Sequence, residues 1–340
     1  MKPPYSPSLL VTGASGFIGS FIVEHALQRG YTVWAAVRPT SSRRYLTDPR
    51  IRFVELDLDH EDRLRRQVEE HRREHGPWEF VIHAAGATKC ACADDFDRVN
   101  HLGTRRLVSC LLEARALERR FVLVSSLSVT GPVHERDYAP ITADDEPRPN
   151  TAYGRSKLAA ERFLAATEGL DYVVLRPTGV YGPREKDYFL MARSVKQHVD
   201  TAAGLRRQII TFIYVRDLAE AALQACDYGP SGRVYLLSDG DEYSSRDFSR
   251  LLQEALGVRF VLRLSVPLWV LRAVCAVSGR LAARRGKAST LNPDKYNIMK
   301  QRNWKCDIKP AIIELGFRPE YNLVRGVAET VAWYKQEKWL

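Results

Sequence analysis

The sequence predicts an α/β fold in which a doubly wound parallel sheet is followed by a smaller C-terminal lobe. Short apolar runs alternate with amphipathic helical stretches from residue 8 to about residue 177. A glycine-rich turn joins the first apolar run to the first helical stretch, and after residue 177 the alternation gives way to shorter elements. Apolar runs separated by helices are typical of βαβ units with parallel strands. We therefore assign the sheet to residues 1–177 and the lobe mainly to residues 178–340, with some later segments returning to the sheet.

Each element of the sheet domain follows from its local pattern. Strands are expected where apolar and β-branched residues run together, and helices where apolar side chains recur every three to four residues. The expected strands cover residues 9–12, 31–37, 51–56, 80–84, 121–125 and 171–176. The expected helices cover residues 16–29, 62–75, 96–116 and 151–167.

Composition is that of an ordinary soluble globular protein. Apolar residues make up 45% of the chain and charged residues 27%, with a formal net charge of +10. Basic and acidic residues interleave, as in residues 63–74, which reads as a solvated helix surface. Because the basic residues form no tract interleaved with aromatic residues, we expect no nucleic-acid partner.

The cysteine pattern gives no reason to expect a metal or a disulfide framework. The six cysteines lack zinc-type spacing, and Cys90 and Cys92 form a C-x-C pair without a second half. No signal peptide is evident at the start of the sequence, and no apolar stretch approaches the roughly 20 residues that a spanning helix needs. These features predict a cytoplasmic protein with reduced thiols.

The glycine-rich turn predicts a dinucleotide-binding domain of the Rossmann type. Glycines at 13, 16 and 19 lie between the first strand and the first helix. They allow a tight turn and a close approach of the main chain to a pyrophosphate at the helix N-terminus. The residues expected to contact the cofactor here are Gly13, Ser15, Gly16, Phe17, Ile18 and Gly19.

Tyr153 and Lys157 form a second motif, four residues apart on one expected helix. Side chains at this spacing share a helix face. A lysine cation beside a tyrosine favours the phenolate and so lowers a tyrosine pKa that is otherwise about 10. Such a pair suits proton exchange with an alcohol or a ketone near neutral pH.

Together these motifs resemble the short-chain dehydrogenase/reductase superfamily, and more narrowly its extended, epimerase/dehydratase-type branch. Within that branch the chain is similar to hydroxysteroid dehydrogenases and dihydroflavonol reductases. The resemblance implies that Ser126 hydrogen-bonds the substrate oxygen and that Tyr153 exchanges its proton. Lys157 would lower the tyrosine pKa and hold the nicotinamide ribose. Ser126 is favoured over Ser128 for the catalytic hydroxyl, and Ser125 would face the cofactor.

The same resemblance assigns further contacts. Asp57 and Leu58 match the position that contacts adenine, and Asn100 matches a structural asparagine. The remaining cofactor contacts are expected at Ala84, Ala85 and Gly86, and at Ser125, Pro177 and Val180 around the nicotinamide. The substrate is expected at Thr88, Ser126 and Thr178.

The segment after the second strand favours NADP(H), with NAD(H) as the alternative. An acidic residue there accepts the ribose hydroxyls, whereas an arginine accommodates a 2′-phosphate. Residues 35–44 contain no carboxylate, and the groups that would surround a phosphate are Arg38, Ser41, Ser42 and Arg43. The alternative is that Arg38 stacks on adenine and that the others are solvated.

Three departures from the family pattern narrow the reaction. Dehydratases of this branch place Asp-Glu directly after the catalytic hydroxyl, where this chain has Leu127 and Ser128. Sugar epimerases carry an arginine where this chain has Ile210, although Arg206 or Arg207 would be substitutes. As part of the same departure, Thr178 and Gly179 replace the asparagine-bearing form of the nicotinamide loop that is common in sugar-nucleotide enzymes.

The third departure is an apolar stretch of the lobe at residues 266–287 that ends in basic residues. It is either a core helix of the lobe or a peripheral membrane contact.

We therefore expect an NADP(H)-dependent enzyme that interconverts a secondary alcohol and a ketone on a largely apolar small molecule, such as a steroid, a long-chain keto-lipid or a flavonoid-like compound. A nucleotide-sugar epimerase with tightly bound NAD is the second hypothesis, and a non-catalytic cofactor-binding redox sensor is the third. By resemblance, the chain would form a homodimer through the helices at 96–116 and 151–167, although Leu107 and Leu111 could equally face the sheet.

Overall fold

The central sheet has seven parallel strands in the order β10-β6-β5-β4-β1-β2-β3, and it confirms the predicted Rossmann-type class. The computed structural model describes residues 6–284 and 291–340. The strands are β1 (Ser8–Thr12), β2 (Thr32–Val37), β3 (Arg52–Glu55), β4 (Trp78–His83), β5 (Leu117–Val124), β6 (Tyr172–Pro177) and β10 (Arg233–Leu237). The strand order reverses between β1 and β4, and in such sheets a crevice opens there at the carboxyl ends.

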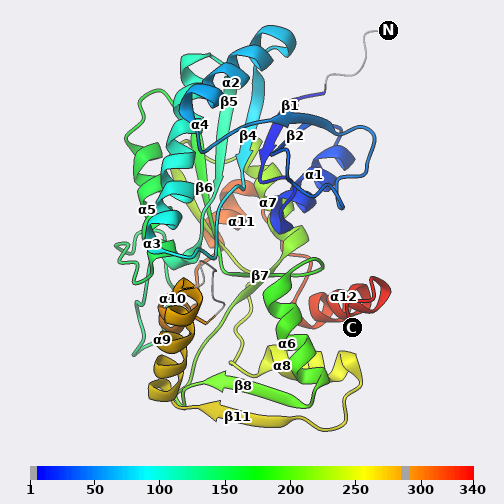
Figure 1. Cartoon of the computed structure of the whole chain (residues 1–340), viewed down its shortest axis with the longest axis vertical. Coiled ribbons are helices and arrows are strands. Elements are labelled where there is room, and N and C mark those ends of the chain that lie inside the picture. The colour runs from blue at the N-terminus through cyan, green and yellow to red at the C-terminus, as the bar shows by residue number, and fades with distance from the viewer. Residues whose placement is uncertain (1–5, 285–290) are drawn as a thin grey trace.

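Helices cover both faces of this sheet (Figure 1). One face carries α1 (Phe17–Gln28) and α7 (Val215–Asp227), and the other carries α2 (Glu61–His75), α4 (Gly103–Glu113) and α5 (Ala152–Ala165). Neighbouring strand residues point to opposite faces, so Leu9 and Val11 pack in the first layer while Leu10 packs in the second. Both layers are fully buried, which is why the strands read as continuous apolar runs.

The helix expected at residues 96–116 is interrupted by a π-helical turn. The segment runs through α3 (Ala93–Phe96), the π turn η1 (Asp97–Leu102) and α4. Asn100 lies in that turn, and only 1% of its surface is exposed. Single π turns inside α-helices are frequent at functional sites, and apolar periodicity does not reveal them.

The C-terminal lobe is built around aromatic side chains. Its elements are β7 (Gly179–Tyr181), α6 (Lys186–Lys196), β8 (Val199–Ala203), β9 (Phe212–Tyr214), α8 (Asp247–Leu256), β11 (Leu262–Val266) and α12 (Leu323–Gln336). The buried cluster between them includes Tyr181, Phe212, Tyr214, Phe248 and Tyr334. The strands pair as two small parallel sheets, β8 with β11 and β7 with β9. The later strand β10 belongs to the central sheet, with α11 (Lys309–Leu315) beside it.

The apolar stretch of the lobe forms α9 (Leu268–Arg284), which packs against α10 (Pro293–Lys300). Leu271 and Cys275 are buried, whereas Trp269 is 76% exposed and Val277 is 55% exposed. The helix is therefore only partly a core helix. Arg285 and Lys287, the basic end of the stretch, lie outside the described residues. No helix among the described residues is long and apolar enough to cross a membrane.

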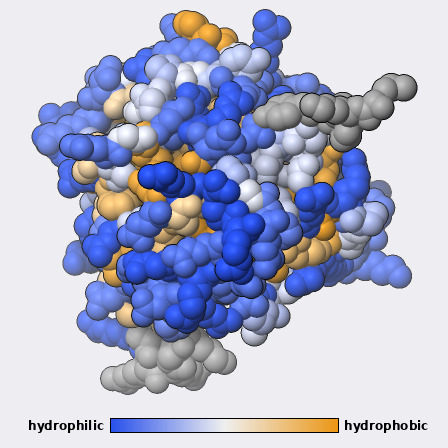
Figure 2. Space-filling view, turned by 90° about the horizontal axis from the view of Figure 1, so that it is seen from above, coloured by the Kyte–Doolittle hydropathy of each residue, from blue (hydrophilic) through white to orange (hydrophobic). Residues whose placement is uncertain are grey.

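The outer surface of the sheet domain is largely hydrophilic (Figure 2). On α4, Leu107 and Leu111 are fully buried against the sheet. These leucines therefore face the sheet of their own chain. They are not available to a partner subunit.

Candidate active site

The glycine turn brings the main chain of β1, α1 and the loop after β4 into close contact. Gly13 has a φ of +67°, and a Cβ there would lie 2.6 Å from the Ala85 nitrogen. A Cβ on Gly19 would lie 2.1 Å from the Gly13 oxygen. Only glycine fits at these two positions, because the added carbon would overlap main-chain atoms.

The start of α1 adds main-chain N–H groups to this turn. Gly16 is the N-cap, and no side chain caps the helix. The first N–H groups of a helix have no partner within it, and together with the helix dipole they attract phosphate. Phe17 and Ile18 form the first turn. They do not line the adjoining cavity, so their predicted role rests on their main-chain N–H groups.

A cavity of about 260 Å³ opens at the strand-order reversal. Its walls include most of the predicted cofactor contacts, namely Gly13, Ser15, Gly16, Arg38, Leu58, Ala84, Ala85 and Gly86. Other lining residues that the sequence analysis had not assigned to the cofactor are Asp59 and Val99. Seven of the sixteen described residues that line it are glycine or alanine. These residues fit a dinucleotide whose pyrophosphate lies at the start of α1.

Arg38 is the free cation at the end of this cavity near β2. Its side chain is exposed and has no hydrogen bond or ion pair with any described residue, while its N–H donates to the Ser41 hydroxyl at 3.0 Å. Arg43 instead stacks on Phe53, 4.2 Å from the ring centroid. Arg38 and Ser41 are thus polar side chains that line this end of the cavity.

Ser42 corrects the expectation for this segment. Its hydroxyl accepts a hydrogen bond from the Arg44 N–H at 3.4 Å, and the residue does not line the cavity. The neighbouring Ser41 lines it instead. Neighbouring residues of this segment thus differ in whether they line the cavity, which composition alone does not show.

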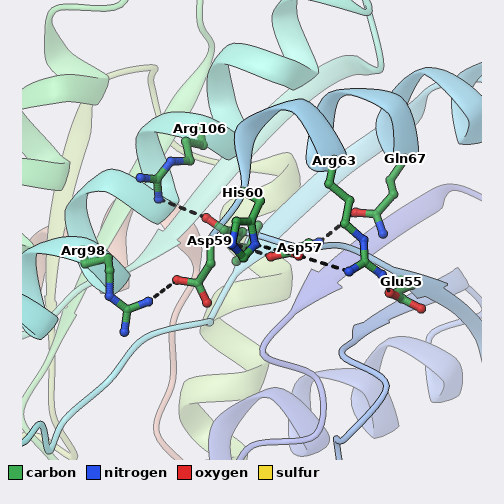
Figure 3. A network of polar contacts seen from close by, with 9 residues as sticks. Glu55, Asp57, Asp59, His60, Arg63, Gln67, Arg98 and Arg106 are labelled. Carbon is green, nitrogen blue, oxygen red and sulfur yellow. Dashed lines mark hydrogen bonds and ion pairs between the residues drawn. The ribbon is translucent and has the colours of Figure 1, made fainter.

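The Asp57 carboxylate also has other binding partners. Figure 3 shows its carboxylate turned toward His60 and Arg63, at 3.0 and 3.4 Å. Burial alone would raise the pKa of Asp57, but hydrogen bonds from His60 and the Asp59 N–H hold it below its usual value. Asp59, which is bound to Arg98, lines the cavity in its place. Leu58 lines the cavity, whereas an adenine contact by Asp57 stays a prediction.

The catalytic candidates meet where β5 ends beside α5. The Lys157 ammonium donates to the Val124 oxygen at 2.9 Å. The Ser126 hydroxyl accepts from the Ser128 N–H at 3.2 Å, and its interaction with the Tyr153 hydroxyl acts to lower the pKa of that tyrosine. The geometry thus brings Ser126 and Tyr153 together and favours Ser126 over Ser128 as the partner of the tyrosine.

Burial controls the protonation of the pair on α5. It raises the pKa of Tyr153 to about 12, although the Ser126 hydrogen bond opposes the rise. Burial also lowers the pKa of Lys157 to about 8, against the effect of Glu161. The expected lowering of the tyrosine pKa is not what the structure gives. Removing both groups from water disfavours both of their charged forms, and this effect outweighs their attraction.

Ser125 belongs to a buried ion pair beneath the site. Its hydroxyl donates to Glu161, whose carboxylate binds the Arg176 guanidinium at 2.6 Å. All three side chains are buried. The Ser125 side chain therefore stabilises the link between β5, α5 and β6, and the prediction that it faces the cofactor is wrong for the hydroxyl.

The loop after β4 is fixed by Asn100. Its amide accepts from the Ala87 N–H at 2.8 Å and donates to the Ala87 oxygen and the Ser156 hydroxyl, both at 3.0 Å. A Cβ on Gly86 would lie 3.1 Å from the Lys157 nitrogen. Glycine therefore lets the loop approach the lysine, and the structural role predicted for Asn100 fits these contacts.

A second cavity of about 330 Å³ adjoins Ser126 on the side of the lobe. Of the residues expected near the reacting groups, Ser126, Thr178 and Pro177 line it, so Pro177 faces the substrate side. The Thr178 hydroxyl is buried and has no hydrogen-bond partner among the described residues. Thr88 is exposed and Val180 is in β7, and neither lines either cavity. The geometry gives no support to a substrate contact by Thr88.

Most of this second wall is apolar and was not predicted. Its apolar members include Leu127, Tyr188, Met191, Ile210, Phe212, Phe248, Ile298, Met299 and Trp304. They come from segments more than a hundred residues apart, so no local pattern joins them. Two of the three departures noted in the sequence, Leu127 and Ile210, lie here, whereas Arg206 and Arg207 do not.

Comparisons with known proteins agree with this geometry. The NAD dependent epimerase/dehydratase family matches residues 9–238. The chain is 31% identical to GDP-6-deoxy-D-mannose reductase of Pseudomonas aeruginosa over 262 residues, which are 72% of this chain and 79% of that protein. It is 27% identical to 4-hydroxy-2-methyl-3-oxo-4-farnesyl-3,4-dihydroquinoline-1-oxide ketoreductase of Stigmatella aurantiaca, over 73% of each chain.

Solved structures share the fold across nearly the whole chain. The dTDP-glucose 4,6-dehydratase of Bacillus anthracis, solved in complex with NAD, superposes with a TM-score of 0.76 at 20% identity. The match covers 98% of each chain. The C-terminal lobe is therefore part of the shared fold as well as the sheet.

Proposed function

Because this chain belongs to the NAD-dependent epimerase/dehydratase family and is an NAD(P)-dependent enzyme of the extended short-chain dehydrogenase/reductase type, we propose that it interconverts a secondary alcohol and a ketone on a largely apolar substrate. The cavity beside Ser126 carries this proposal. Its wall is mostly apolar, and among the described residues no carboxylate lines it. A nucleotide sugar carries two phosphate charges, and the described part of this wall offers them one cationic side chain, Lys295, among mostly apolar groups.

The residues at this site divide the chemistry between them. The nicotinamide cofactor supplies or accepts the hydride when it is bound. Ser126 donates a hydrogen bond to the carbonyl oxygen and so stabilises the negative charge that develops there. Tyr153, protonated at neutral pH, gives its proton to that oxygen. Lys157 holds a positive charge beside the tyrosine up to a pH of about 8.

The main test is hydride transfer. Purified protein given NADPH and a panel of hydrophobic ketones should oxidise NADPH, and Tyr153→Phe should lower kcat about 10²–10⁴-fold while cofactor binding persists. Tyr228→Phe is the matched control, since Tyr228 is 58% exposed on the surface and lines neither cavity. Persistent turnover in Tyr153→Phe would remove the assigned role of the tyrosine. A protein that binds cofactor but never turns over would instead be the redox sensor.

NADP(H) is the proposed cofactor because of Arg38 and Ser41 at the cavity wall. Arg38→Gln should weaken NADPH binding about tenfold to a hundredfold and leave NADH binding unchanged, since a charge-assisted hydrogen bond to the phosphate is lost. Arg43→Gln is the control, because Arg43 is held on Phe53. Equal losses for the two cofactors would favour adenine stacking by Arg38.

A nucleotide-sugar epimerase with tightly bound NAD is the second candidate. The relative with 31% identity has a GDP-sugar in its name, which favours a nucleotide-sugar substrate, although that name is of a reductase and not of an epimerase. The two proposals differ in what the purified protein retains. Denaturation should release no stoichiometric NAD if the chain is a ketone reductase. Activity on a UDP- or GDP-sugar without net cofactor consumption would establish the epimerase instead.

Peripheral membrane contact through α9 is proposed for the exposed side of that helix. Trp269, Val277 and Leu281 are exposed, and Arg272 and Arg280 lie beside them. A helix with this composition binds in the interface of an anionic bilayer. Sedimentation with vesicles rich in phosphatidylserine should therefore be lost in Trp269→Gln. A homodimer through residues 96–116 and 151–167 stays a prediction. Of the other leucine and phenylalanine contacts expected for it, Leu158 is buried, and Leu102 and Phe163 are partly exposed.

A further inference from the structure

We propose that Lys295 binds an anionic group of the substrate, so that the natural substrate joins an apolar body to a carboxylate or a similar anion. This inference rests on the proposed function and specifies its substrate class. The reacting carbon would lie at Ser126, and the anion would lie where α10 meets the same cavity. Ser126 is one of the expected catalytic residues, whereas Lys295 lies outside all of the sequence motifs described above.

The charge at Lys295 has no counterpart in the cavity wall. Of the described residues that line the cavity, Lys295 is the only one with a charged side chain. Its nearest carboxylate oxygen belongs to Asp187, at 3.9 Å, which is the outer limit of an ion pair. The other oxygen of that carboxylate is already bound to Lys89. One carboxylate therefore faces two ammonium groups, and a positive charge remains at the cavity.

The helix α10 holds this lysine in a fixed place. Lys295, Ile298 and Met299 share one helix face, at a spacing of three and four residues, and all three line the cavity. The Lys295 N–H donates to the side chain of Asn292, which caps the helix, at 2.8 Å. On another side of the helix, Asp294 accepts from the Ala152 and Tyr153 N–H groups at 2.8 and 3.2 Å. The cation is thus carried by an element anchored to the catalytic helix.

A group bound at such a site should be selected by charge as well as by shape. The Lys295 side chain is 37% exposed, so solvent screens part of the attraction. A hydrogen bond to a charged group still favours the anion by about tenfold to a hundredfold over a neutral group of the same shape. The preference should weaken as salt is added.

The first experiment compares matched ketones. Straight-chain keto acids with the ketone next to the terminal methyl group would be assayed with NADPH beside their methyl esters. Wild-type protein should favour the acid over the ester by about tenfold or more in kcat/KM. Lys295→Met should remove that preference, and Lys295→Arg should retain it. Lys300→Met makes the same change on the same helix, at a residue that does not line this cavity, and should leave the preference intact.

The second experiment does not depend on turnover. Calorimetry with decanoate and decan-1-ol should show tighter binding of decanoate to wild-type protein and equal binding of the two to Lys295→Met. If neither ketone is reduced but decanoate binding depends on Lys295, the anion site stands and the proposed reaction fails. If ketones are reduced but wild-type protein prefers neither the acid nor decanoate, the reaction stands and the inference about Lys295 is overturned.

Discussion

The two cavities of this molecule differ in the kinds of residue that form their walls. The cofactor cavity has many glycine and alanine residues in its wall, which comes mainly from the ends of β1, β2, β3 and β4 and the loops that follow them. The substrate cavity is walled by large side chains such as Met191, Phe248 and Trp304, from segments spread over residues 126–304. The difference teaches where each function resides. A shared cofactor needs a main-chain shape, whereas substrate choice depends on side chains that can change one by one.

The catalytic groups lie at the boundary between these cavities. Ser126 lines the substrate cavity, and Lys157 lies against Gly86, which lines the cofactor cavity. Asp294 ties the boundary to the lobe through the first amides of α5. Substitutions on the two sides should therefore give different patterns of failure.

Gly13→Ala should have the largest effect, and it should lower cofactor affinity without changing the substrate cavity. The new Cβ would overlap the Ala85 nitrogen, so we expect cofactor affinity to fall at least about a hundredfold, as measured by NADPH fluorescence titration. Gly30→Ala is a matched control, because Gly30 also has a positive φ but has no atom within 4 Å of its Cβ position. Both variants lose about 1–2 kcal/mol of stability from the left-handed conformation.

The milder Gly16→Ala variant guards against a Gly13→Ala protein that does not fold. Its Cβ would meet the Gly13 oxygen at 3.1 Å, so cofactor affinity should fall by less. If cofactor affinity in these two variants equals that of Gly30→Ala, the cavity is not shaped by main-chain contact and the comparison fails.

The pH dependence tests the boundary. Lys157 has a pKa of about 8, so its positive charge is present below this pH and is lost as pH rises through it. Tyr153, with a pKa of about 12, stays protonated over the same range. The kcat/KM for ketone reduction should therefore fall above about pH 8, by about tenfold per pH unit once the lysine is mostly neutral.

Lys157→Arg gives the control for this profile. A guanidinium stays charged throughout the range, so the decline that begins near pH 8 should disappear even if the overall rate is lower. A wild-type profile that stays level up to pH 10 would show that the Lys157 charge does not limit the reaction.

Asp294→Ala tests the link from the lobe to the catalytic helix. Losing the acceptor for the two amides should lower stability by about 0.5–2 kcal/mol, as losing a helix cap does. We also expect kcat to fall about fivefold, equivalent to about 1 kcal/mol, while the KM for NADPH stays unchanged. Asp294→Asn, which keeps an oxygen acceptor, should restore most of the rate. Loss of stability without any change in kcat would confine Asp294 to the fold.

Thr178→Val should have the smallest effect, and its two readouts should move in opposite directions. The Thr178 hydroxyl is buried without a partner, so an isosteric methyl should raise the melting temperature slightly. If that hydroxyl contacts the substrate, kcat/KM should fall by about twofold, as expected for the weaker neutral hydrogen bonds. Thr130→Val removes another buried, unpartnered hydroxyl that lies outside the cavity, and it should stabilise the protein without changing the rate. Equal behaviour of the two variants would remove Thr178 from the substrate site.

Some errors of the sequence analysis arose where side-chain direction matters. Ser125 and Ser126 are neighbours, yet one hydroxyl binds Glu161 and the other lies beside Tyr153. Likewise, the Asp57 carboxylate binds His60, whereas Asp59, for which no role was expected, lines the cofactor cavity. The direction of a side chain after a strand ends depends on the turn that follows, and several turns suit one composition.

The sequence by itself determined the sheet, the glycine turn and the Tyr153–Lys157 helix, because these depend on neighbours within about one helical turn or one strand. Only the tertiary structure decided the pKa of Tyr153 and the position of the Arg38 cation at the cofactor cavity. It also decided the mostly apolar wall of the substrate cavity and the position of Lys295 in that wall. The physical reason is that burial and cavity shape depend on contacts between distant segments. Residues 126 and 295 meet at one cavity, and no local periodicity records that meeting.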